Sequence, residues 1–163
     1  MYVLDPDSNI TTTKMTMLSS LESFSEEQDL NWTGVVGDRH SASFMDAALT
    51  REGGVFIYCG HCGGKSCFSR SQVENLTCPV SRSVGASPVK DRPCRASVVL
   101  MGCSCGRLRL VNRKKSGALR TALSIFYDTE GVYLTYICAG AYCVVGNLWY
   151  VTHKEIDRYV CRP

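Results

Sequence analysis

Two short clusters of cysteine residues have the spacing of metal ligands. Cys59 and Cys62 are separated by two residues in "VFIYCGHCGG", and Cys103 and Cys105 by one residue in "VVLMGCSCGRLRL". In both clusters an apolar run leads into the cysteines and glycine follows, which is typical of a tight turn that directs two thiolates at one ion. Structural zinc sites use four such ligands in a tetrahedron. The spacing therefore predicts that these four cysteines bind one Zn²⁺.

Other ligand sets stay open in the sequence. Cys67 and Cys78 follow the first cluster and would complete a local set with it, whereas His61 stands between two ligands and is expected to point away. Small buried thiols are common in protein cores. We interpret the remaining cysteines as core residues or as a second site: Cys94, Cys138, Cys143 and Cys161.

The run Cys59-Gly60-His61-Cys62 resembles the active site of protein disulfide isomerase and other thioredoxin-like proteins over four residues. The resemblance implies a thiol–disulfide oxidoreductase in which the first cysteine begins a helix that lowers its pKa. Gly63 and Gly64 oppose helix initiation directly after the motif. The oxidoreductase is therefore an alternative to the zinc protein, using Cys59 and Cys62.

A cysteine hydrolase would need a thiol within hydrogen-bond reach of an imidazole. Cys143 and His153 lie in one segment of the chain, with Asp157 shortly after them. Cys143, however, stands in the apolar run "AYCVVG", and apolar surroundings raise the pKa of a thiol and make it inert. We therefore predict no catalytic residue and a chain that is not an enzyme.

A basic segment follows the second cysteine cluster. Two of its arginines alternate with leucines in "RLRLV", so both are expected on one exposed strand face. Phosphate contacts of this kind dominate the affinity of proteins for nucleic acid. As an alternative function we predict a zinc protein that binds nucleic acid through Arg107, Arg109, Arg113, Lys114 and Lys115, within a hairpin at 107–120.

The elements that must position these residues are predicted from periodicity. A helix is expected over 41–52, with Ser41 or Ser43 as the N-cap and Gly53 and Gly54 as its end. A shorter helical stripe recurs from 15 to 24, and residues 1–12 are expected to be a mobile tail. From residue 97 onward short alternating runs predict strands, including 132–139 and a hairpin around Gly146 and Asn147.

Length and charge indicate one domain with an arm. The chain has 163 residues, of which 45% are hydrophobic, and a net charge of +3. Residues 1–52 hold nine acidic and three basic residues, whereas the rest is basic. We predict a partly mobile acidic Ser/Thr-rich arm over 1–32 and a single cysteine-rich zinc-binding domain over 33–163. The expected fold class is α+β, an N-terminal helical segment followed by a zinc-stabilised antiparallel sheet.

No apolar run approaches the length of a membrane helix, and no signal peptide is visible, so we expect an intracellular protein of the cytoplasm or nucleus. The Asn-x-Thr sequences at Asn9, Asn31 and Asn75 leave glycosylation open. The predicted function is a zinc-binding regulatory or adaptor protein that acts through protein partners. Its composition is typical of virus-encoded accessory proteins. Nucleic acid and a homo-oligomer stay open as partners, and a membrane is not expected.

Overall fold

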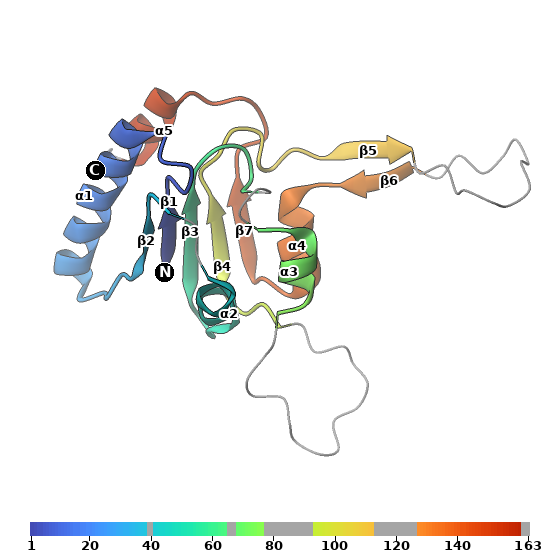
Figure 1. Ribbon diagram of the computed structural model, residues 1–163, viewed down its shortest axis with the longest axis horizontal. Coiled ribbons are helices and arrows are strands. Elements are labelled where there is room, and N and C mark those ends of the chain that lie inside the picture. The colour runs from blue at the N-terminus through green and yellow to red at the C-terminus, as the bar shows by residue number, and fades with distance from the viewer. Residues whose placement is uncertain (39–40, 65–67, 77–92, 113–126, 161–163) are drawn as a thin grey trace, which may run out of the picture.

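The computed structural model describes residues 1–38, 41–64, 68–76, 93–112 and 127–160. Five strands form one sheet in the order β2-β1-β3-β4-β7, and every neighbouring pair in it is parallel (Figure 1). The strands are β1 (Tyr2–Leu4), β2 (Gly34–Val36), β3 (Val55–Cys59), β4 (Ser97–Leu100) and β7 (Cys143–Gly146).

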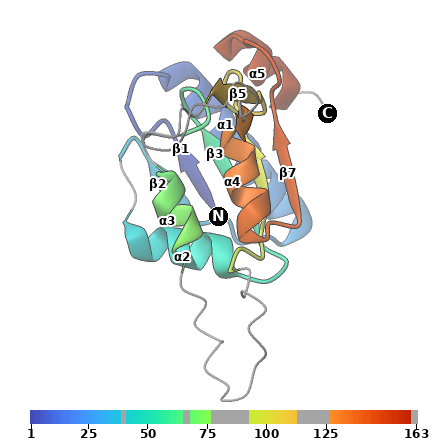
Figure 2. The same ribbon diagram turned by 90° about the vertical axis from the view of Figure 1, so that its right-hand side faces the viewer.

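Helices cover both faces of this sheet. Helix α1 (Thr11–Gln28) and helix α5 (His153–Val160) pack together on one face, as Figure 1 shows. The other face is covered by α2 (Ala42–Thr50), α3 (Arg70–Glu74) and α4 (Val132–Ala139), of which α3 and α4 lie side by side in Figures 1 and 2. The molecule is thus a three-layer α/β structure with a parallel sheet at its centre.

Alternation along the central strands divides the core between the two faces. Phe56 and Tyr58 of β3 point into the cluster that contains α2, α3 and α4, whereas Ile57 and Cys59 belong to the cluster around α1. This is the period of two that a strand imposes on its side chains. Because both faces of β3 and β4 are covered, their sequences are nearly continuous apolar runs, as is typical of parallel strands.

Local signals explain where several helices begin. The Ser41 hydroxyl accepts a hydrogen bond from Phe44 N at 3.2 Å, which makes it the N-cap of α2. Ser69 and Gln72 form a capping box at the start of α3. Asp5, in the left-handed conformation after β1, accepts hydrogen bonds from Asn9 N and Ile10 N ahead of α1. The predicted helix over 41–52 is found as α2 with Ser41 as its cap, but it ends at Thr50 with an extended Arg51 as C-cap, so the predicted end at Gly53 and Gly54 is wrong.

A second, two-stranded sheet projects from the body. Strand β5 (Arg109–Asn112) pairs antiparallel with β6 (Tyr127–Glu130), and the pair extends away from the main sheet in Figure 1. Helix α4 begins directly after β6 and returns the chain to the sheet. No helix within the described ranges combines the length and the apolar character that crossing a membrane requires.

The predicted fold class is wrong. The main sheet is parallel and its strands are joined through helices, whereas an antiparallel, zinc-stabilised sheet after a helical segment was expected. The segment 132–139 is helix α4 in place of a strand, and Cys143–Gly146 pairs with β4 in place of a hairpin across Gly146. Residues 2–4, expected in a mobile tail, form β1 between β2 and β3. The division of the chain at residue 32 stays a prediction.

Candidate active site

The site lies at the carboxyl ends of the parallel strands. The loop after β3, residues 60–64, and the loop after β4, residues 101–106, leave neighbouring strands at this edge of the sheet. Met101 N donates a hydrogen bond of 2.7 Å to Tyr58 O, and a side chain at Gly102 would overlap the carbonyl of Cys62. In parallel sheets this edge is the usual place of ligand sites, because the loops from several strands meet there.

Tight turns shape both loops. Cys62 has a φ of 51° and Ser104 a φ of 54°, so both take the left-handed conformation that non-glycine residues seldom adopt. The Tyr58 hydroxyl donates to the carbonyl of His61 at 3.1 Å and fixes the first loop to the core. Strained backbone of this kind is found at functional sites more often than elsewhere.

The thiols of Cys62 and Cys103 meet between the two loops. Their side chains are close enough to influence each other's ionisation, with Cys62 exposed and Cys103 half-buried. Burial, and then the neighbouring Cys103 thiol, raise the pKa of the Cys62 thiol above its ordinary value. Cys62 is therefore mainly protonated near neutral pH.

Cys105 has a structural role in the second loop. Its side chain is 1% exposed, donates a hydrogen bond of 3.0 Å to Leu100 O and accepts one of 3.1 Å from Asn147 N. The Asn147 side chain also donates to Gly102 O at 3.1 Å. The segment after β7 is thereby tied to the loop on both sides of Cys103, which fixes the position of that residue.

Cys59 is excluded as a reactive thiol. Its side chain is fully buried at the end of β3, in the apolar cluster beneath α1. Burial, and then the carboxylates of Asp157 and Asp5, raise its pKa to about 12. Because the thiolate is the nucleophilic form of cysteine, a thiol with this pKa is inert at neutral pH. The dithiol mechanism considered from the sequence, with Cys59 attacking, has no support in this geometry.

His61 is the imidazole of the first loop. The residue is exposed, and its ring lies 5.4 Å, centroid to centroid, from that of His153 at the start of α5. Helix α5 thus brings a second imidazole to the same edge of the sheet. Cys143, which was paired with His153 in the sequence, is the first residue of β7. It therefore lies at the end of that strand that is away from the site.

The predicted zinc ligands are partly brought together. Cys62, Cys103 and Cys105 lie close enough for their charges to interact, but Cys59 points into the core beneath α1. Within the described ranges, no three or more His, Cys, Asp or Glu side chains are grouped as a metal ion requires. The zinc-stabilised fold is wrong, and zinc binding by these four thiols stays a prediction. Cys67, Cys78 and Cys161 fall outside the described residues.

The predicted nucleic-acid surface is only partly described. Arg107 and Arg109 are exposed, the latter at the start of β5. Arg113, Lys114 and Lys115 lie outside the described residues. A contact of these five residues with nucleic acid stays a prediction.

A cavity of about 530 Å³ lies between α3 and α4, beside the first loop. Phe68, Val73 and Tyr136 are among its lining residues, and neither His61 nor Cys103 is. The cavity therefore does not define the place where a reacting group would sit. The thiol of Cys103 and the loop that carries His61 meet outside it, at the strand ends.

An accessible thiol and an imidazole at the ends of adjacent parallel strands are the groups that a cysteine hydrolase uses. The family model "Separin, protease domain" matches residues 1–156. The chain belongs to this family.

Individual relatives agree with this assignment. The chain is 34% identical to separin of Mus musculus over 158 residues and 29% identical to separin of Emericella nidulans over 159 residues. Each match covers 97% of this chain and 6% of the relative, so the chain spans a small fraction of the relatives' length. The crystal structure of the Saccharomyces cerevisiae separase–securin complex shares the fold, with a TM-score of 0.66 and 20% identity over 97% of this chain and 8% of that chain.

Family membership overturns the predicted function, both of its alternatives and the prediction that the chain is not an enzyme. The chain is not a zinc-binding adaptor or a viral accessory protein, because it belongs to a family of protease domains. The same finding contradicts the two alternative functions, a zinc protein that binds nucleic acid and a thiol–disulfide oxidoreductase. The prediction that the chain is not an enzyme is wrong as well.

The sequence contained the candidate residues, but their roles were assigned incorrectly. Cys103 was given to a metal and His61 was expected to point away. A usable signal was present: two short apolar runs, "VFIYC" and "SVVLM", each lead directly into a loop, one carrying a histidine and the other a cysteine. Such runs are typical of buried parallel strands, whose ends share one edge.

Proposed function

We propose that this chain is the catalytic region of a cysteine protease, in which Cys103 is the nucleophile and His61 the general base. The observation that carries the proposal is the position of these residues at the ends of β4 and β3, in a chain whose family is a protease domain. Among the thiols of the two loops, Cys59 and Cys105 are buried and Cys62 has a raised pKa. Cys103 is the thiol that remains.

The chemistry follows from these two groups. The imidazole of His61 takes the proton from the Cys103 Sγ, and the thiolate attacks the carbonyl carbon of the substrate peptide bond. The tetrahedral intermediate collapses as the C–N bond breaks, and the imidazolium gives its proton to the leaving amine. Water, deprotonated by the neutral imidazole, then hydrolyses the thioester and releases Cys103.

The loops supply the orientation that this reaction needs. The hydrogen bonds of Cys105 and Asn147 fix the turn that presents Cys103, and the Tyr58 hydroxyl fixes the loop of His61. Holding the reacting groups in place in this way lowers the entropic part of the barrier. The ring of His153 lies edge-on to that of His61, 5.4 Å away between centroids.

The test is a comparison of variants on a panel of fluorogenic peptides that differ in the residue before the cleaved bond. Cys103→Ser is expected to lower kcat/KM by roughly 10⁴-fold or more, and His61→Ala by roughly 10²–10⁴-fold. Cys138→Ser, which changes an exposed thiol on α4, serves as the control and is expected to be fully active. Equal activity of Cys103→Ser and the control would exclude the assignment.

Alkylation gives a second readout that needs no substrate. Iodoacetamide reacts with thiolates, so Cys103 is expected to be modified faster than Cys138 near neutral pH and more slowly after His61→Ala. Cys59 is expected to stay unmodified in the folded chain, because it is buried and its pKa is about 12. Peptide mapping by mass spectrometry measures the three rates, and rapid labelling of Cys59 would contradict its assigned burial.

We also propose a protein partner and an intracellular location. A solved structural neighbour is a separase in complex with securin, which supports a protein partner for this chain. A nucleophilic thiol remains reduced in an intracellular compartment, which supports the location. Co-elution of the chain with Saccharomyces cerevisiae securin in size-exclusion chromatography tests the partner, and separate elution at micromolar concentrations would count against it.

A further inference from the structure

We propose that Cys62 and Cys103 form a reversible disulfide, which switches the active site off when a hydroperoxide is present. The inference rests on the proposed function, since it assigns the regulation of the same site. It begins from the two loops at the strand ends, which touch at Gly102 and Cys62 and bring the thiols of Cys62 and Cys103 close to each other.

The backbone brings the two loops into direct contact next to the two cysteines. A side chain at Gly102 would overlap the Cys62 carbonyl, so the residue before Cys103 lies directly against Cys62. A disulfide requires Cα atoms about 4.4–6.8 Å apart and sulfur atoms that face each other. Neighbouring thiols on adjoining loops are consistent with the second requirement, and the close backbone contact supports the first.

The surroundings of the thiols at the strand ends favour a disulfide between Cys62 and Cys103 over one with Cys59 or Cys105. Cys105 is buried, and its sulfur is held between Leu100 O and Asn147 N. Cys59 points into the core beneath α1. Cys62 is exposed, so both an oxidant and a reducing thiol can reach it, and the Cys103 thiol acts on it more strongly than the Cys105 thiol does.

The conformation of Cys62 adds an independent observation. Its φ of 51° is left-handed, where glycine is the residue without steric cost. A cysteine therefore occupies a position that disfavours side chains, and this side chain lies against the proposed nucleophile. Neither the fold of the loop nor the proposed hydrolysis requires a thiol at this position.

The chemistry balances with a hydroperoxide as oxidant and a small thiol as reductant. Cys103 first reacts with the peroxide, forming a sulfenic acid and releasing water, or an alcohol from an organic peroxide. The Cys62 sulfur attacks the sulfenic sulfur, the S–S bond forms, and a second water leaves. Two equivalents of a thiol reduce the bond, become a disulfide themselves, and return both cysteines to thiols.

The disulfide would also protect the enzyme. A sulfenic acid without a partner is oxidised further to sulfinic and sulfonic acids, and the sulfonic form is irreversible. With Cys62 in contact, the sulfenic acid is consumed before this happens. Peroxide inhibition is therefore expected to be reversible in the wild type and to become irreversible once Cys62 is replaced.

The experiment treats the full chain with hydrogen peroxide in buffer that contains a chelator, then maps its peptides and measures peptidase activity before and after dithiothreitol. The wild type is expected to lose the two thiol hydrogens, to yield a Cys62–Cys103 peptide pair, and to recover at least ~80% of its activity. Cys62→Ser is expected to be active before treatment and to recover little afterwards. Cys62→Gly, which suits the left-handed backbone, provides the same test if the serine variant folds poorly.

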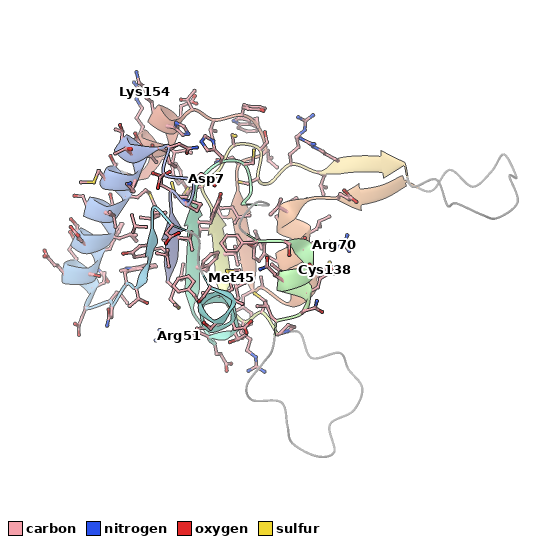
Figure 3. All side chains as sticks on the ribbon, viewed as in Figure 1. Asp7, Met45, Arg51, Arg70, Cys138 and Lys154 are labelled. Carbon is pink, nitrogen blue, oxygen red and sulfur yellow. The ribbon has the colours of Figure 1, made fainter. Side chains whose placement is uncertain are left out.

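Cys138→Ser is the matched control, because Cys138 is an exposed thiol on α4, on the far side of the molecule from α1 and α5 (Figure 3). It is expected to behave as the wild type. A disulfide between other cysteines, or full recovery of both Cys62 variants, would overturn the switch. If the bond forms in a chain without peptidase activity, the proposed function fails separately. If peptidase activity is present and no bond forms, only the switch fails.

Discussion

At the scale of single residues, Gly102 sets the distance between the two loops of the site. It lies directly against the Cys62 carbonyl, so any side chain at this position must displace backbone atoms. We expect Gly102→Ala to destabilise the fold by about 1–3 kcal/mol, the usual cost of overpacking. Because Cys103 is the next residue, we also expect its alkylation by iodoacetamide to change and peptidase activity to fall. Denaturant unfolding and labelling rates measure the two effects.

A matched variant separates a loss of fold stability from a change in the geometry of the active-site loops. Gly53 has a φ of 66° and open space around it, so Gly53→Ala is strained only by its left-handed backbone, at about 1–2 kcal/mol. It lies at the amino end of β3, away from the site. This variant is expected to lose similar stability and to keep its activity and Cys103 reactivity. Equal losses of activity in both variants would mean that Gly102 matters only for folding.

At the scale of elements, helix α5 holds His153 beside His61 and begins with a charge-dependent cap. The Glu155 carboxylate accepts hydrogen bonds from Thr152 N at 2.6 Å and from the Thr152 hydroxyl at 2.9 Å. The backbone hydrogen bond from Thr152, then the hydroxyl, lower the pKa of Glu155 below its ordinary value. Because the pKa of Glu155 is lowered on folding, the cap stabilises the folded chain fully at pH values above the pKa of Glu155 in the unfolded chain. This stabilisation is lost as the pH falls through the pKa of Glu155 in the folded chain.

We therefore expect the first turn of α5 to open in acid. Amide hydrogen exchange of residues 152–156 should be slow near neutral pH, after correction for intrinsic rates, and should lose protection as Glu155 is protonated. Glu155→Gln keeps an acceptor for the same donors and removes the charge, so its protection is expected to be weaker at neutral pH and to vary little with pH. An identical pH profile in both proteins would show that the charge does not hold the helix start.

Elements also show how far the sequence could be interpreted. The start of helix α2 was predictable because its signals are local, a serine cap and an apolar side, whereas its end at Thr50 lies before the two glycines that were expected to terminate it. Helix α4 was not, since "VYLTYICA" is rich in β-branched and aromatic residues, and its helical form is stabilised by packing against β7 and α3. Cys62, Cys103 and Cys105 lie on real loops at the strand ends, but the parallel pairing that makes these loops neighbours depends on distant residues.

At the scale of the whole molecule, strand order could not be read from the chain. The N-terminal strand β1 lies between β2 and β3 and has three residues, too few for a period of two to identify it. The site depends on this order less than on one pair, β3 with β4, which brings His61 and Cys103 to one edge. Both residues could be picked out in the sequence. That β3 and β4 are neighbours, which makes His61 and Cys103 a candidate catalytic pair and not parts of a metal motif, could not be predicted.

The surface after β7 leads to the last prediction. Leu148, Trp149 and Tyr150 are 60%, 69% and 79% exposed, while the Trp149 carbonyl accepts a hydrogen bond from Ser104 N at 2.9 Å. The backbone of this segment therefore supports the loop of Cys103, and its side chains stay in solvent. Contiguous exposed apolar side chains promote association. Replacing all three by serine is expected to reduce concentration-dependent self-association, measured by light scattering, and to change unfolding free energy by less than about 0.5 kcal/mol.

A substitution of a buried residue serves as the comparison for the triple variant. Ile156 on α5 is 5% exposed, and Ile156→Ser is expected to destabilise the chain by several kcal/mol because a core contact is lost and a hydroxyl is buried. The triple variant should also keep its peptidase activity, since the hydrogen bond to Ser104 comes from the backbone. If the triple variant unfolds as easily as Ile156→Ser, the three side chains pack on the fold and do not form an open surface.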